Sequence, residues 1–67
     1  MQMKRVVVGI EGTRKSLIYD VNPTNDDKTN IEEAVKLAKD EIKFEGIDHA
    51  IKMHEGQEPD VWIRTDE

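Results

Sequence analysis

The chain has 67 residues, of which 37% are charged, and its 10 Lys and Arg against 15 Asp and Glu give a formal net charge of −5. A chain of this length builds one small domain, residues 1–67, and its single Trp, Tyr and Phe leave little large apolar surface for a deep active-site cleft. The absence of Cys excludes disulfides, thiolate zinc sites and cysteine nucleophiles.

Two segments near the start of the chain have the composition of β-strands. Residues 4–10 (KRVVVGI) and 16–21 (SLIYDV) are rich in β-branched residues, and the second alternates in hydrophobicity. The connector between them contains Gly12, which readily adopts a positive φ, so the simplest arrangement is a β-hairpin. The apolar run within 4–10 is far shorter than the about 20 residues of a membrane span, and we expect a cytoplasmic protein.

A helix is predicted to follow a loop of turn-forming residues at 22–28 (NPTNDDK). Thr29 stands three residues before Glu32, the spacing of a capping box, which predicts that the helix begins at Thr29. It should continue to about Glu45, because Gly46 is suited to the left-handed conformation that ends many helices. The apolar stripe is formed by Ile31, Ala34, Val35, Ala38 and Ile42, widened at one edge by Leu37 and Phe44.

Two further strands are predicted after the helix. Residues 47–54 alternate apolar and polar positions with a period of two, residues 55–60 contain Gly56 and Pro59 and form a turn, and residues 61–64 form a short last strand. The order ββαββ predicts an α+β domain in which one helix covers one face of a small, mainly antiparallel sheet.

Strand alternation divides the predicted sheet into two faces. The face toward the helix should receive Val6, Val8, Ile10, Leu17, Tyr19, Val21, Ile47, His49, Ile51, Met53, Val61 and Ile63. The opposite face, with no second layer to cover it, should receive Arg5, Val7, Ile18, Lys52, His54, Trp62 and Arg64.

The second face is the candidate functional surface. A Trp with aliphatic neighbours and a basic rim has the composition of a protein-interaction patch. Alternatively, Trp62 folds over the sheet edge as a lid on the core. A third hypothesis is a nucleic-acid-binding module, in which Trp62 stacks on a base and the cations meet phosphates. The net charge of −5 disfavours nucleic acid, since it repels phosphate.

No residue constellation indicates catalysis, a metal or a cofactor. His49 and His54 are five residues apart, and neither a strand nor a helix brings both imidazoles to one metal ion. No Ser or carboxylate stands at a spacing that would make either histidine a catalytic base. We therefore expect a non-enzymatic protein without cofactor or metal; a minimal enzyme, for which only the scattered acids and histidines speak, is the remaining alternative.

The length, the acidic charge and a hairpin followed by a capped helix with the sequence EEAxxxA together resemble the small accessory proteins of bacteriophages and mobile elements. Some of those proteins bind and block a host enzyme, so the resemblance implies a non-enzymatic inhibitor that binds a protein partner. It is a resemblance of architecture, and it carries over no functional residue. We also expect a homodimer to form at high concentration, burying Trp62 across a two-fold axis, because the sheet has two edges and one uncovered face.

Overall fold

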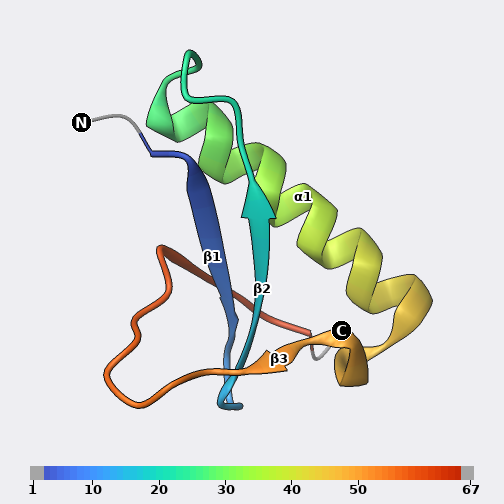
Figure 1. The fold of residues 1–67 in the computed structure, drawn as a ribbon. Helices are drawn as coiled ribbons and strands as arrows, with labels where there is room; N and C mark the ends of the chain where they lie inside the picture. Colours follow the sequence, from blue (N-terminus) through green and yellow to red (C-terminus); the bar gives the residue numbers. More distant parts are fainter. Residues whose placement is uncertain (1–2, 66–67) are drawn as a thin grey trace.

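The computed structural model describes residues 3–65 and shows an α+β domain, with one helix packed against a four-stranded mixed sheet (Figure 1). The strands lie in the order β3-β2-β1-β4. The elements are β1 (Arg5–Ile10), β2 (Lys15–Asp20), the helix α1 (Asp27–Glu45), the short 3₁₀ helix η1 (Ile47–His49), β3 (Ile51–Lys52) and β4 (Val61–Ile63).

The predicted N-terminal hairpin is confirmed. β1 and β2 pair antiparallel in a register that places Val8 opposite Leu17 and Gly9 opposite Ser16. Gly12 lies in the turn with φ 82°, a conformation that a residue with a side chain adopts only under strain.

The sheet is mixed, so the prediction of a mainly antiparallel sheet is wrong. β3 pairs antiparallel with β2, but β4 pairs parallel with β1, with Val8 opposite Val61 and Ile10 opposite Ile63. The reason is the connection between β3 and β4, which crosses from one edge of the sheet to the other instead of turning back as a hairpin. In Figure 1 this connection lies on the opposite side of the hairpin from α1.

The helix begins two residues earlier than the capping box predicts. Asp26 is the N-cap, and its Oδ1 accepts a hydrogen bond of 2.9 Å from the backbone N–H of Thr29. Asp and Thr are both favoured caps, and the carboxylate wins here because Asp27 already has helical backbone geometry. The predicted C-terminus is confirmed: α1 ends at Glu45, and Gly46 has φ 89° and donates its N–H to Ile42 O.

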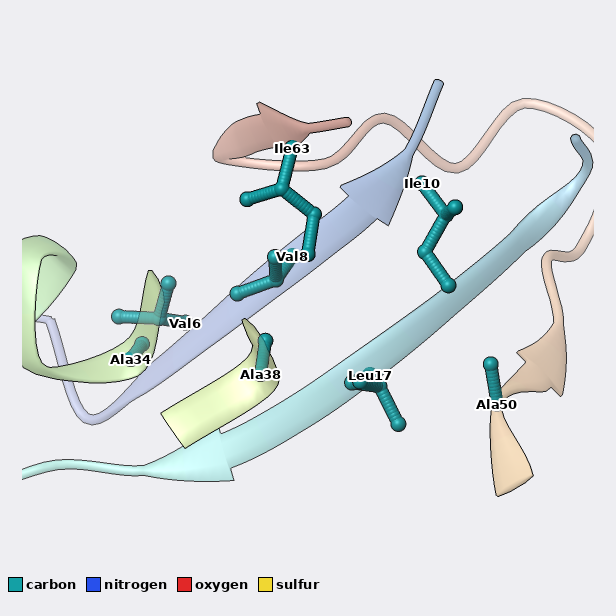
Figure 2. Packing of buried hydrophobic residues seen from close by; sticks show 8 residues of the cluster. All are labelled: Val6, Val8, Ile10, Leu17, Ala34, Ala38, Ala50 and Ile63. Carbon is teal, nitrogen blue, oxygen red and sulfur yellow. The ribbon is translucent and has the colours of Figure 1, made fainter. Parts of the chain in front are cut away.

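The core lies between α1 and the sheet face formed mainly by β1. Figure 2 shows Val6, Val8 and Ile10 along this face of β1, in one cluster with Ala34 and Ala38 of α1. The two alanines are small and let the helix lie close to the sheet. Because both are buried, the predicted apolar stripe is confirmed at its centre. The buried hydrophobic residues are Val6, Val8, Ile10, Leu17, Ala34, Ala38, Ala50 and Ile63.

At the edges of the stripe the prediction differs from the structure. Leu37 and Phe44 do not extend the core, since they are 52% and 78% exposed. Asn30 instead lies fully buried on the core side of the helix, where its Nδ2 donates to Asn22 O at 3.0 Å. This hydrogen bond ties the start of α1 to the loop that precedes it.

The predicted third strand is wrong over most of its length. Ile47 and His49 belong to η1, and only Ile51 and Lys52 form strand. The alternation phase is also reversed. Ile51 pairs with Ser16 and lies on the face away from α1, whereas Lys52 pairs with Lys15 on the side of the helix. The buried residue of this segment is Ala50, which the period-two pattern assigned to the other face.

Candidate functional site at the outer sheet face

The sheet face away from α1, here called the outer face, carries one row of residues that crosses all four strands. Ile51 pairs with Ser16, Ser16 with Gly9, and Gly9 with Trp62. Paired residues project to the same side of a sheet. The two central strands contribute the small residues Ser16 and Gly9 to this row. The two edge strands contribute the large apolar residues Ile51 and Trp62, which are 51% and 47% exposed.

Gly9 provides the space in which Trp62 lies. A Cβ added to Gly9 would lie 2.8 Å from Cε3 of Trp62 and 2.4 Å from Cγ of Pro59. Both rings therefore cover the backbone of β1 at this point, at a distance that only a residue without a side chain permits. The indole is held on one side and open to solvent on the other.

The outer face is partly covered, contrary to the prediction that no second layer covers it. Residues 53–60 connect the two edge strands and bring Pro59 over Gly9. Ser16, in the same row, is fully buried, and its Oγ has no hydrogen-bond partner. Trp62 thus contributes to a small layer over the centre of the sheet and also exposes about half of its surface. The indole therefore packs over the sheet, as the lid alternative predicts, and leaves an exposed part, as the interaction-patch alternative requires.

Asp60 fixes the end of this connection to β1. Its backbone N–H donates to Val7 O at 2.8 Å, and its Oδ2 accepts the N–H of Val7, also at 2.8 Å. The carboxylate takes the place of the backbone carbonyl that a longer parallel strand would present. These two hydrogen bonds hold the backbone to β1 two residues before Trp62.

The structure brings only part of the predicted site together. Val7 and Ile18 pair across the hairpin, lie on the outer face and are half-buried, and Trp62 lies on the same face. Lys52 lies on the opposite face, and His54 is exposed in the connection after β3.

The two predicted arginines do not form a shared basic rim. Arg5 begins β1, whereas Arg64 follows β4 beside the end of β1, so the two lie at opposite ends of the sheet. Arg64 Nε lies 3.6 Å from Glu11 Oε1, an ion pair that offsets its charge. The cations proposed for phosphate contacts are thus dispersed.

Sequence reasoning misses several residues that the structure places on or over the outer face, among them Gly9, Ser16, Ile51 and Pro59. Gly9 carried a usable signal, because glycine inside a strand often marks a close approach of another group. The period-two alternation places Ile51 on the wrong face, because part of the segment that it covers forms a 3₁₀ helix. Nothing in the local sequence indicates that Pro59 lies over Gly9.

A second polar cluster lies on the helix side. The hydroxyl of Tyr19 donates to Glu41 Oε1 at 2.5 Å, and His49 Nε2 lies 3.3 Å from Glu41 Oε2. Burial, and then the carboxylate of Glu41, raise the pKa of Tyr19 well above its ordinary value. This cluster joins β2, α1 and η1, and it confirms that Tyr19 faces the helix. His49 is more exposed than its predicted strand position implied.

One further feature of the described surface is a small depression. A depression of about 250 Å³ lined by Glu11, Gly12, Arg64 and Thr65 is below the about 300 Å³ at the low end of ligand pockets. Within residues 3–65, no group of three or more His, Asp or Glu side chains is placed to hold a metal ion. No helix of that part of the chain has the length and apolar character to cross a membrane.

The chain matches no protein-family model, no curated protein and no solved structure. The resemblance to phage accessory proteins therefore stays a prediction.

Proposed function

We propose that the chain is a non-enzymatic module that binds a protein partner through its outer face, with Trp62 as the anchor. The observation that carries the proposal is the position of Trp62, half-exposed and held against Gly9 and Pro59. Large aromatic side chains dominate the binding energy of protein interfaces. An aromatic ring already fixed in the unbound protein loses little conformational entropy on binding.

The connection that covers part of the outer face is acidic, which favours a partner of complementary charge. Glu55, Glu58 and Asp60 are exposed and belong to the connection that carries Pro59. The net charge of the chain is −5. A protein with an apolar pocket and a basic rim fits such a surface, and charge complementarity would raise the rate of association.

A nucleic acid is the less favoured partner. Trp62 is available for stacking, but Lys52 lies on the helix side and Arg64 is paired with Glu11. The exposed acids near Pro59 would repel a phosphate backbone. Binding to a single-stranded oligonucleotide that weakens steeply as salt rises would favour this alternative.

Affinity capture tests the proposal. The chain, immobilised at a density low enough to keep it monomeric, is compared with Trp62→Ala and with Leu37→Ala, a control that removes an apolar side chain of similar exposure from the helix. A protein retained by the parent chain and by Leu37→Ala, but lost with Trp62→Ala, supports an outer-face interface. Equal retention by all three chains contradicts it.

We further propose, from the resemblance to phage and mobile-element proteins, that the partner is an enzyme of a host cell and that binding blocks it. The captured partner is assayed for activity while the chain is added in increasing amounts. Loss of activity at one equivalent supports inhibition. Activity that is unchanged at saturation contradicts inhibition, while leaving the binding itself established.

A further inference from the structure

The edge of β2 away from β1 is only partly paired. β3 pairs with Lys15 and Ser16 alone. Within residues 3–65, no strand runs beside residues 17–20 on that side. An open strand edge presents unpaired backbone groups that another strand can satisfy.

The hydrogen-bond alternation shows which groups face this edge. Val21 N–H donates to Lys4 O at 3.1 Å, on the β1 side, whereas Arg14 O accepts Met53 N–H at 2.9 Å, on the β3 side. Odd-numbered residues of β2 therefore bond to β1, and even-numbered residues face the other way. Ile18 and Asp20 accordingly direct their N–H and C=O groups to the open edge.

Two exposed apolar side chains of α1 lie on the same side of the domain as this edge. Leu37, Glu41 and Phe44 are spaced by four and three residues and share one side of the helix. Glu41 accepts the hydrogen bond of Tyr19 from β2, so this side of α1 is turned toward β2. Leu37 and Phe44, 52% and 78% exposed, are the large apolar residues of α1 that are most exposed.

We propose that this edge forms a homodimer in which β2 pairs antiparallel with β2 of a second copy, about a two-fold axis at Tyr19. The register is self-complementary. Ile18 of one copy faces Asp20 of the other, and the two such pairs exchange four backbone hydrogen bonds. Tyr19 faces its own symmetry mate, and the two four-stranded sheets become one continuous sheet.

The same axis explains the two exposed residues on α1. A two-fold axis perpendicular to a continuous sheet keeps both helices on one face. Because α1 packs mainly against β1 and β4, the two helix axes would be at least three strand spacings, about 14 Å, apart. Directly packed helices are about 8–10 Å apart, so large side chains are needed between them. Leu37 and Phe44 from both copies have the size and position to fill this space.

A second copy therefore fits this edge better than an isolated peptide strand. A peptide would satisfy the backbone of β2 but would bring no helix to cover Leu37 and Phe44. The arrangement also leaves both Trp62 side chains on the opposite face, where they point in the same direction. A dimer of this kind would present two outer faces to a partner and gain affinity by bivalent binding.

Amide hydrogen exchange measured by NMR at increasing protein concentration tests this interface. The amides of Ile18 and Asp20 should slow by on the order of tenfold or more as the dimer forms. Those of Leu17 and Tyr19, already bonded to β1, serve as internal references and should be protected at every concentration. Fast exchange at Ile18 and Asp20 in a sample shown to be dimeric would overturn the proposal.

Sedimentation equilibrium of variants provides a second test. Phe44→Glu should weaken the dimer by about tenfold or more, while Lys43→Gln, with the same change in charge on the neighbouring residue, should leave it within about twofold. Ile18→Pro should also dissociate the dimer, because it removes a donor that the monomer does not use. A chain that stays monomeric at millimolar concentration, or a dimer that only Trp62→Ala dissociates, would contradict the proposed interface.

Discussion

Gly9 and Trp62 are register partners on neighbouring parallel strands, and the indole lies over the position that a Gly9 side chain would occupy. A Cβ at Gly9 would lie 2.8 Å from the indole and 2.4 Å from Pro59. Gly9 is not among the glycines with positive φ, so its role is to leave space. One small residue near the end of β1 thus determines how the only Trp is presented.

The first prediction concerns this contact. Gly9→Ala should destabilise the domain by about 1–3 kcal/mol, because the methyl group forces Pro59 and Trp62 away from β1. The loss should be smaller in Gly9→Ala/Pro59→Ala than in a sum of the two single variants, since Pro59→Ala removes the atom nearest to the new methyl group. Thermal unfolding measures both. Additive losses would show that the close contact is not the cause.

The local elements could largely be predicted from the sequence, because they depend on local signals. The hairpin follows from β-branched segments around Gly12, and α1 ends at Glu45, directly before Gly46, as predicted. The start of α1 was misplaced because Asp26 and Thr29 are both good caps, and the choice depends on backbone geometry.

The pairing of the edge strands could not be predicted in this way. The composition of residues 53–60 fits a hairpin turn as well as a crossover, so the parallel direction of β4 has no local signal. The part of the candidate site that depends on one short alternation is predicted correctly. Trp62 is out of phase with the buried Ile63 and therefore lies on the outer face. The prediction is wrong at Lys52, because the alternation does not persist through the 3₁₀ helix that precedes β3.

The second prediction separates core from surface in β4. Ile63→Ala should cost about 2–5 kcal/mol, since Ile63 is buried against α1. Trp62→Ala should cost less, because half of the indole surface is already in water. Chemical denaturation compares the two variants. If Trp62→Ala is the more destabilising, Trp62 acts chiefly as a lid.

The third prediction concerns the start of α1. Hydrogen bonding from Thr29 lowers the pKa of Asp26 below its ordinary value of 3.8. A depressed folded-state pKa gives stability that is present above the unfolded value and lost as the pH falls through the lower folded value. Asp26→Asn keeps the capping oxygen without the charge, so its melting temperature should depend less on pH below about 4. If the melting temperatures of both chains fall in the same way as the pH is lowered, Asp26 does not contribute to the acid dependence of stability.

The fourth prediction concerns Tyr19. Its pKa is raised by burial and by Glu41, so its contribution to stability is present below the ordinary value of 10.0 and is lost as the pH rises further. Because Tyr19 is the only tyrosine, the phenolate absorbance reports its titration directly. Tyr19→Phe should lower the free energy of unfolding by about 1 kcal/mol at neutral pH. It should also make the loss of stability at alkaline pH smaller than in the parent chain. A Tyr19 titration at the ordinary value in the folded protein would contradict the hydrogen bond to Glu41.

The central claim, that Trp62 anchors a protein partner on the outer face, is tested most directly by measuring partner affinity in the parent chain, Trp62→Ala and Leu37→Ala. All three chains are first shown to be folded by thermal unfolding. We predict that Trp62→Ala weakens binding by about thirtyfold or more, equivalent to about 2 kcal/mol, while Leu37→Ala binds as the parent chain does when all are compared below the concentration of dimer formation. Undiminished affinity in Trp62→Ala would contradict the account.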